Sequence, residues 1–322
     1  MSTAVPAGAS VARDETTSRA RSAPNRPRRV QHSDRTRHER RLGVLLVAPA
    51  LVLMVAVTGY PIANAIWLSL FDYRLTAPAD RSFAGLGNYA TVLSDGLFWR
   101  QFGVTAGITV FTVVVEFVLG FALAMVMHRA LFLRKVLRTA ILIPYGIITV
   151  VSAYAWQYAF TPAYGFVNPL LGLGDFNWFG DTLPSLFVIS LSEIWKTTPF
   201  MSLLLLAGLA QIPEDYLEAA KVDGATAWQR FRKVVMPNMK AAIMVAVLFR
   251  TLDAFRIFDN VFIMTQGAQG TETLSFLAYR QTISRVQIGL GSAVSVILAV
   301  LVILIAVMFV KGFKTDLSQR GA

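Results

Sequence analysis

The stretch "QIGLGSAVSVILAVLVILIAVMFV", residues 287–310, contains no charged side chain, and Lys311 follows it directly. A helix rises about 1.5 Å per residue, so about 20 apolar residues cross the roughly 30 Å hydrocarbon core of a bilayer. This stretch is therefore long enough and apolar enough to form a membrane-spanning helix. It decides the class of fold, because it does not suit the surface of a soluble domain.

Five further stretches share this character, in a chain of 322 residues that is 55% hydrophobic and only 15% charged. Such a composition is too apolar for a soluble globular protein of this length. We predict an all-α integral membrane protein whose six transmembrane helices form one domain over 42–311. The predicted spans are 42–68, 102–127, 137–160, 185–209, 241–264 and 287–310.

The distribution of Lys and Arg predicts how the chain is oriented. Ten arginines precede residue 42, four cations follow the second span, five lie in the loop at about 210–240, and three follow the sixth span. The other three loops hold five cations between them. Cytoplasmic loops carry the excess of Lys and Arg, so we expect the N- and C-termini and the 210–240 loop in the cytoplasm. Membrane lipid rather than nucleic acid then accounts for the net charge of +11.

Both chain ends are predicted to be tails. Residues 1–41 are rich in Arg, Ser, Thr and Pro and poor in large apolar side chains, so a disordered basic tail is expected. The C-terminal tail is 312–322. The pair Arg40-Arg41 before an apolar run superficially resembles a twin-arginine signal, but the run is long for a signal peptide. The chain has no cysteine, which excludes disulfides and thiolate chemistry.

A charged stretch, "PEDYLEAAKVDGATAWQRFRKVVMP" from 213 to 237, separates two apolar runs. Pro213 and the two acidic residues after it favour the start of a helix. Gly224 is expected to end this helix in the left-handed conformation, and Asp223 to cap a second helix. The second helix has one apolar face, and Pro237 introduces the fifth span. The apolar residues of that face are Trp228, Phe231 and Val235.

This bent pair of helices could lie on anionic lipid headgroups, as basic amphipathic helices do. Its first helix indicates another role, because Ala219 and Ala220 permit the close approach of a protein surface. The Glu218 carboxylate beside them suits a cationic partner and not an anionic lipid. These residues favour docking into a protein groove.

The same stretch resembles the EAA loop of permease subunits of ABC importers. The matching positions are Glu218-Ala219-Ala220, then Gly224, then Val234 and Met236-Pro237. The usual ending in that family is Ile-x-Leu-Pro, so Val234 and Met236 depart from it but stay apolar. The resemblance extends to Leu142–Ile147, Ile194–Ala220 and Phe255–Gly267, while Thr265–Gly270 departs from the common "TGGGP" ending.

The resemblance implies a type I ABC importer permease fold in a bacterial cytoplasmic membrane. It also implies four kinds of partner: a second permease, two cytoplasmic ATPase subunits, an extracytoplasmic sugar-binding lipoprotein and lipid. The blocks at 142–147 and 248–260 are most similar to permeases of actinobacterial trehalose importers, which implies a disaccharide such as trehalose. ATP and Mg²⁺ would bind to the partner ATPase subunits, and this chain would bind no cofactor. The residues implied to couple to the ATPase are Glu218, Ala219, Ala220, Asp223, Gly224, Ala225 and Pro237.

Charged and polar residues inside the predicted spans point to a substrate path, since each charge is costly in the membrane. Arg250, Asp253 and Arg256 recur every three residues, and Glu193 and Lys196 have the same spacing, so each set can pair internally. Glu116, Asp259 and Asn260 lack an evident local partner and could face a polar cavity. Aromatic rings near such residues could stack on a sugar. The predicted path residues are Glu116, Glu193, Trp195, Asp259 and Asn260, with Phe255 and Phe258 as further candidate rings.

No catalytic or metal-binding residue is predicted, because the sequence contains no phosphate-binding loop, zinc-protease motif or nucleophile elbow. We therefore expect no enzyme activity in this chain. Two rival functions stay open. A proton-coupled secondary transporter would use Glu116 or Glu193 as its proton carrier. A membrane scaffold that transports nothing would leave the same charges as structural pairs.

Overall fold

The computed structural model describes residues 34–129 and 134–312. The predicted tails, 1–41 and 312–322, lie largely outside these residues. The chain divides after Val57 into two compact units, which are described separately. The first unit contains helix α1 (Asp34–Met54), which includes Pro49 and leads into a π-helical turn, Val55–Gly59. The apolar side chains of α1 are mostly exposed, which suits a helix in contact with lipid or another chain.

The second unit is a bundle of helices with one short hairpin. In the hairpin, β1 (Phe71–Asp72) pairs antiparallel with β2 (Ser82–Phe83), and a 3₁₀ turn, Pro78–Asp80, lies between the strands. A second 3₁₀ turn, Ala268–Gly270, lies far along the chain from the hairpin. The helices are α2 (Tyr60–Ser69), α3 (Gly87–Ser94), α4 (Gly96–Arg129), α5 (Arg134–Gly146), α6 (Thr149–Phe160), α7 (Val167–Leu171), α8 (Thr182–Leu209), α9 (Glu214–Val222), α10 (Ala227–Arg230), α11 (Met236–Asn238), α12 (Lys240–Ala254), α13 (Asp259–Met264), α14 (Leu274–Tyr279) and α15 (Ile288–Gly312). Two π-helical turns, Phe231–Val235 and Arg280–Ser284, follow α10 and α14.

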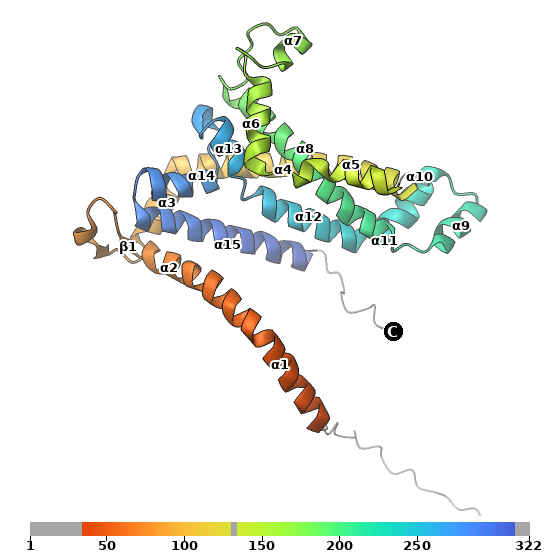
Figure 1. Ribbon diagram of the computed structural model, residues 1–322, viewed down its shortest axis with the longest axis horizontal. Coiled ribbons are helices and arrows are strands. Elements are labelled where there is room, and N and C mark those ends of the chain that lie inside the picture. The colour runs from red at the N-terminus through yellow and green to blue at the C-terminus, as the bar shows by residue number, and fades with distance from the viewer. Residues whose placement is uncertain (1–33, 130–133, 313–322) are drawn as a thin grey trace, which may run out of the picture. The chain divides into compact units, whose positions relative to one another are not determined.

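The centre of the bundle is formed by α4, α8 and α12, which pack against one another. Small residues allow the close approach. A Cβ built on Gly120 of α4 would meet the Met201 Cγ of α8 at 2.8 Å. Figure 1 shows these helices running in one general direction, with α15 beside α12.

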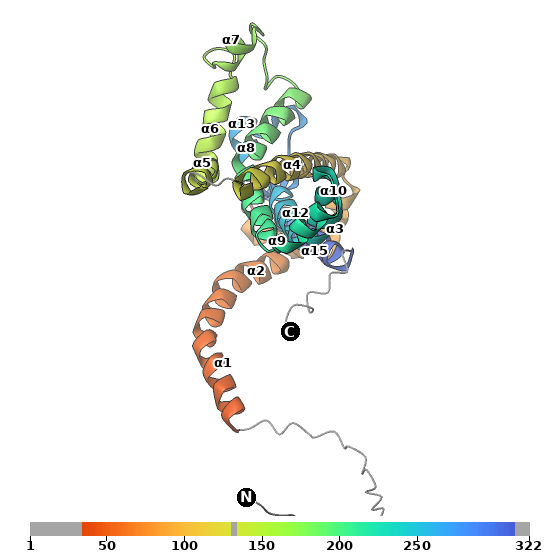
Figure 2. The same ribbon diagram turned by 90° about the vertical axis from the view of Figure 1, so that its right-hand side faces the viewer.

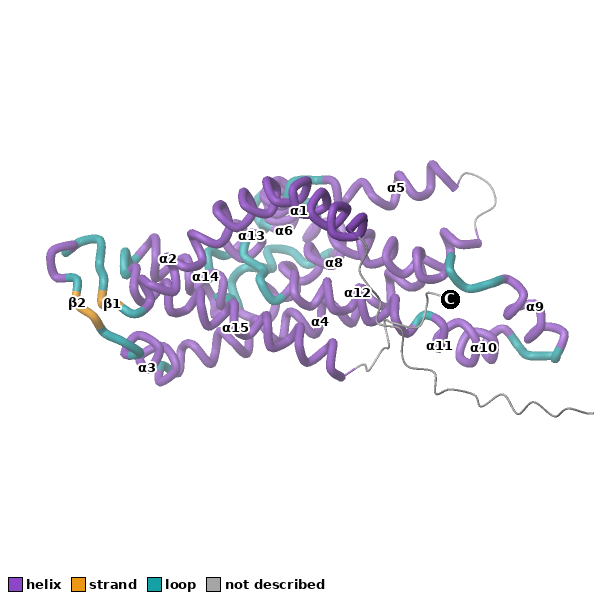
Figure 3. The backbone as a smooth tube through the Cα atoms, turned by 90° about the horizontal axis from the view of Figure 1, so that it is seen from below, coloured by secondary structure: helices purple, strands orange, loops and turns teal. Residues whose placement is uncertain are grey.

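The two ends of this unit differ in kind. The β1–β2 hairpin and α3 lie at one end, while α9, α10 and α11 lie at the other (Figure 3). The views in Figures 1 and 2 agree that α6 leads away from the bundle to α7. The charged stretch 213–237, which contains α9 and α10, is therefore separated from the hairpin by the length of the bundle helices.

Among the residues that the structure describes, three helical segments are long and apolar enough to cross a membrane: Arg41–Ser69, Gly96–His128 and Ile288–Gly312. These correspond to the predicted first, second and sixth spans. The predicted third span is a bent pair, Val136–Gly146 and Thr149–Phe160, whose halves meet at 85°. Helix α5 continues through Pro144 to Gly146, and the bend falls at residues 147–148, where the Ile148 backbone (ψ of 132°) leaves the helical conformation.

The fourth and fifth predicted spans also differ from continuous apolar helices. The fourth corresponds to α8, a helix of 28 residues that buries several Ser and Thr side chains and Glu193. The fifth is broken, since α12 ends at Ala254 and α13 begins at Asp259. Irregular backbone at membrane depth is tolerated where it lines a cavity. The break therefore marks a place to look for a site.

Candidate functional site

A buried arginine lies at the meeting point of three helices. Arg250 of α12 and Glu116 of α4 are both 0% exposed. The Arg250 Nε donates to Glu116 Oε2 at 2.5 Å, and Nη2 donates to Glu116 Oε1 at 2.9 Å. This two-point contact matches the planar fork of a guanidinium to a carboxylate. Glu116, which has no evident partner in the sequence, is thus paired across 134 residues.

Arg250 also contacts two further carboxylates. Its Nη2 lies 3.2 Å from Glu193 Oε1 on α8, and its Nη1 donates to Asp253 Oδ2 at 2.5 Å. The second contact confirms the internal Arg250–Asp253 pair that the spacing allows. One guanidinium therefore joins α4, α8 and α12, and offsets part of the cost of placing carboxylates inside the bundle.

Asn260 extends this network to α13. Its Nδ2 donates to Glu193 Oε2 at 2.8 Å, and the residue is 1% exposed. The Asn260 Oδ1 has no hydrogen-bond partner among the residues that the structure describes. A buried amide oxygen without a donor is costly, and this atom has almost no accessible surface, so a ligand or water would reach it only if neighbouring side chains moved.

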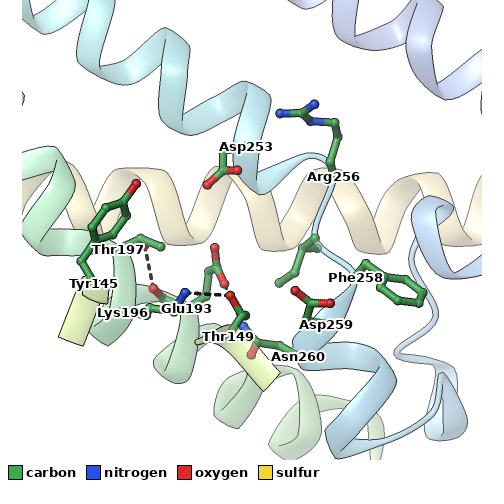
Figure 4. Close-up of a pocket in the computed structure, with 11 residues that line it drawn as sticks. Tyr145, Thr149, Glu193, Lys196, Thr197, Asp253, Arg256, Phe258, Asp259 and Asn260 are labelled. Atoms are coloured by element: carbon green, nitrogen blue, oxygen red, sulfur yellow. Dashed lines mark hydrogen bonds between the residues drawn. The ribbon is translucent and has the colours of Figure 1, made fainter. Parts of the chain in front are cut away.

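The network lies beside a cavity of about 410 Å³ at the break between α12 and α13. Side chains from α5, α6, α8, α12 and α13 surround it (Figure 4). Carboxylates and cations both face this space, together with two aromatic rings. The lining residues are Tyr145, Thr149, Glu193, Lys196, Thr197, Asp253, Arg256, Ile257, Phe258, Asp259 and Asn260.

Three of the five predicted path residues line this cavity: Glu193, Asp259 and Asn260. The structure places the other two elsewhere. Glu116 is fully buried in its pair with Arg250, and Trp195 is 40% exposed with its ring against Trp156, 5.9 Å between ring centroids. Trp195 lies next to Lys196 in sequence, but consecutive helical residues face in different directions.

Of the two further candidate rings, Phe258 lines the cavity. Phe255 does not, because it is buried in an apolar cluster with Leu274 and Leu277. Sequence reasoning missed Tyr145 and Thr149, whose apolar surroundings give no polar pattern to follow. They reach the cavity because the chain bends between α5 and α6.

The pair suggested by the spacing of Glu193 and Lys196 is wrong. Within the described part of the chain, Glu193 contacts Arg250 and Asn260 instead. The Lys196 Nζ donates to Thr149 Oγ1 at 2.7 Å and faces the cavity. A three-residue spacing permits an ion pair but does not choose between it and a stronger tertiary partner.

Residues 213–237, called the docking element after the role that the sequence predicts for them, have the predicted bend. Gly224 has φ of +75°, in the left-handed region. The Gly224 amide donates to the Lys221 carbonyl at 3.1 Å, and the Ala225 amide donates to the Ala220 carbonyl at 3.0 Å. These two bonds form a Schellman motif, which ends α9 and fixes the direction of the chain after it.

The predicted cap of the second helix is wrong. Thr226 caps α10: its Oγ1 accepts from the Gln229 amide at 3.3 Å, and the Thr226 amide donates to Gln229 Oε1 at 2.8 Å. Asp223 is instead the C-cap residue of α9, directly after the last helical residue, Val222. Asp223 lies before the glycine bend, so the helix that starts after the bend is capped by the next suitable hydroxyl, which belongs to a capping box.

The element presents one face outward and one to the bundle. Glu218 and Ala219 are exposed, and Ala220 is half-buried. On the inner side, the Phe231 ring packs against Phe121 of α4 at 5.4 Å between centroids. Trp228, predicted on the same apolar face, is 67% exposed although its ring stacks on Phe231. Part of the apolar face is therefore free for contact with another molecule.

A second buried ion pair lies near the hairpin end. Arg280 Nη1 is 2.8 Å from Glu272 Oε2, and Gln101 Nε2 donates to the same oxygen at 2.5 Å. Burial raises the pKa of Glu272, while the nearby Arg280 charge and the Gln101 hydrogen bond oppose the rise. No pattern in the sequence joins these residues, which come from α4 and from the region around α14.

A helical membrane bundle with a polar cavity at a broken helix and an exposed, bent pair of short helices is the arrangement expected of a permease. The chain belongs to the family described as "Binding-protein-dependent transport system inner membrane component", which matches residues 116–313. It is therefore an inner membrane component of a transport system.

Several characterised relatives share most of the chain. The trehalose transport system permease protein SugA of Mycobacterium tuberculosis is 54% identical over 85% of this chain and 89% of its own length. The trehalose/maltose transport system permease protein MalF of Thermococcus litoralis is 37% identical over 85% of this chain and 94% of its own length.

Solved structures share the fold. A chain of a bacterial ABC transporter that imports the acidic polysaccharide alginate matches with a TM-score of 0.74 and 20% identity, over 87% of this chain and 97% of that chain. A chain of the MetNI methionine ABC transporter matches with a TM-score of 0.52 and 19% identity, over 68% of this chain and 95% of that chain. The predicted importer permease fold is confirmed by these matches.

Proposed function

We propose that this chain is a permease subunit of an ATP-driven importer for trehalose or a related disaccharide, and that the cavity between α12 and α13 is part of the sugar path. The observation that carries the proposal is a polar cavity beside a helix break in a chain 54% identical to a trehalose permease. The share of each chain that the match covers supports a common substrate class.

The chemistry of the cavity suits a neutral sugar. Sugar hydroxyls both donate and accept hydrogen bonds, and the cavity offers acceptors such as Asp253 and Asp259 with donors such as Lys196. Phe258 and Tyr145 provide flat apolar surfaces for sugar ring faces. Charges of both signs line the space, so it does not strongly favour an ion of either sign.

The energy would come from partner subunits. The sequence contains no phosphate-binding loop, so ATP and Mg²⁺ would bind two cytoplasmic ATPase subunits. In this proposal the exposed Glu218 and Ala219 dock on an ATPase, and Gly224 keeps the docking helix at a fixed angle. A second permease would complete the path, and an extracytoplasmic sugar-binding lipoprotein would deliver the sugar. The chain would be multi-pass in a bacterial cytoplasmic membrane, with both termini in the cytoplasm.

A proton-coupled carrier is less well supported. Such a carrier needs a carboxylate that exchanges protons with both sides of the membrane. Glu116 is instead fully buried against Arg250, and Glu193 is held by Arg250 and Asn260. A membrane scaffold gains no support either, because it needs no polar cavity beside a broken helix.

Uptake of radiolabelled trehalose by proteoliposomes tests the proposal, with the second permease, the two ATPase subunits and the binding protein present. We expect uptake that requires ATP and the binding protein and survives an uncoupler. Glu218→Lys and Gly224→Asp should leave the complex assembled but reduce uptake and sugar-stimulated ATP hydrolysis. Asp80→Lys, which reverses an exposed carboxylate in the turn between β1 and β2, is the control for assembly.

Two results would count against the proposal in different ways. Normal uptake in both Glu218→Lys and Gly224→Asp would remove the coupling assignment. Uptake of another solute in preference to trehalose would remove the substrate assignment and leave the transport role intact.

A further inference from the structure

We propose that Arg250 is a positioning residue that fixes the cavity side chains and joins them to the two helices flanking the docking element. The inference rests on the proposed transport function. Arg250 lines neither the cavity nor the outer surface: it is 0% exposed and lies behind the lining residues. It therefore acts through the groups it holds rather than by touching the sugar.

The geometry requires an arginine at this position. Four hydrogen bonds run from one guanidinium to the carboxylates of Glu116, Glu193 and Asp253, at 2.5, 2.9, 3.2 and 2.5 Å. The planar fork directs its N–H groups to several sides at once, whereas a lysine ammonium is a single point charge on a flexible stem. A lysine at residue 250 would keep the charge but hold fewer of the three carboxylates.

Two of these carboxylates belong to the cavity wall. Glu193 and Asp253 line the cavity, and Glu193 in turn accepts a hydrogen bond from Asn260 Nδ2. This bond fixes the orientation of the Asn260 amide, and Asn260 also lines the cavity. Arg250 thus positions a third lining residue, Asn260, through Glu193.

The same contacts connect the cavity to the docking element. Four residues separate the end of α8 from the start of α9, and a single residue separates α11 from α12. Near the docking element α8 and α12 touch at Gly208 and Ala242, and deeper in the bundle they are joined by Arg250 and Glu193. Two separate fixed contacts prevent the helices from pivoting about either one. A displacement of the docking element would then move α8 and α12 together and shift the cavity wall.

The test uses the complete transporter in proteoliposomes with Arg250→Lys, and Arg138→Lys as the matched control. Arg138 is an exposed arginine on α5, outside the cavity and the docking element. We expect Arg250→Lys to assemble and to need an unchanged concentration of sugar-loaded binding protein for half-maximal uptake. Its maximal uptake rate should fall about tenfold, in the range seen for residues that couple two sites. The control should match the wild type.

A second pair of variants separates positioning from simple charge balance. Arg250→Met leaves carboxylates unpaired in the bundle, so we expect poor assembly. Adding Glu116→Gln removes one of those charges and should restore assembly, but not the uptake rate. A wild-type rate in either Arg250→Lys or the double variant would overturn the proposal. If Arg250→Lys fails to assemble, the double variant decides alone, and the wild type and Arg138→Lys report separately on whether the complex transports the sugar.

Discussion

Gly208 of α8 and Ala242 of α12 lie so close that a Cβ built on Gly208 would meet the Ala242 Cβ at 2.4 Å. This separation is too short for two carbon atoms, so only glycine fits on α8 at this level. The contact lies just inside the docking element, where α8 and α12 leave and re-enter the bundle. The close approach of these helices is therefore set by one missing side chain.

Gly208→Leu should force α8 and α12 apart. Overpacking of a tight interface costs about 1–3 kcal/mol, so the midpoint of thermal unfolding in detergent should fall. Gly103→Ala is the control, because a Cβ at Gly103 meets nothing within 4 Å and alanine favours a helix. Equal midpoints for Gly208→Leu and the wild type would show that the helices do not pack as closely as described.

The capping box at Thr226 makes a local prediction. Thr226→Ala removes the hydroxyl that accepts from the Gln229 amide, and a lost cap costs about 1 kcal/mol. Hydrogen exchange at the Gln229 amide should then be about fivefold faster, as measured by mass spectrometry or NMR. Asp223→Ala should leave this exchange rate unchanged. The opposite ranking of the two variants would restore Asp223 as the cap.

The stability of the hairpin end should depend on pH through Glu272. Burial raises the pKa of Glu272 in the folded chain, so between the ordinary value of 4.5 and the raised value the folded state binds more protons than the unfolded state. Its contribution to stability is therefore greatest below pH 4.5 and is lost as pH rises through the folded pKa. Glu272→Gln should flatten this part of the curve of unfolding midpoint against pH. An unchanged slope in that variant would contradict the assignment.

The sequence predicts the helical membrane fold and the bent docking element, because both depend on local patterns. Long apolar runs specify membrane spans, and a glycine such as Gly224 commonly ends a helix by taking the left-handed conformation. The interruptions of the third and fifth spans are less visible. A proline at 144 and a charged segment at 253–259 are compatible with either a straight or a broken helix until neighbouring helices are placed.

The site was predictable only in part, for a physical reason. Asp259 and Asn260 are polar residues in an apolar run, and they do line the cavity. The ion pairs are harder to predict, since Glu116 and Arg250 are 134 residues apart in the sequence and come together only in the folded bundle. Residue spacing suggests neighbours along one helix, whereas the strongest contacts of Arg250 join three helices. A ring such as Trp195 likewise gives no sign in the sequence of the direction it faces.

The pairing of Glu116 with Arg250 also has a consequence for how the chain is made. Glu116 leaves the ribosome 134 residues before its partner, a delay on the order of ten seconds at ordinary rates of synthesis. During that time α4 must enter the membrane with an unpaired carboxyl group near its middle, supported only by its other apolar side chains. Biogenesis therefore has a waiting step, which ends when α12 is inserted and delivers the counter-ion.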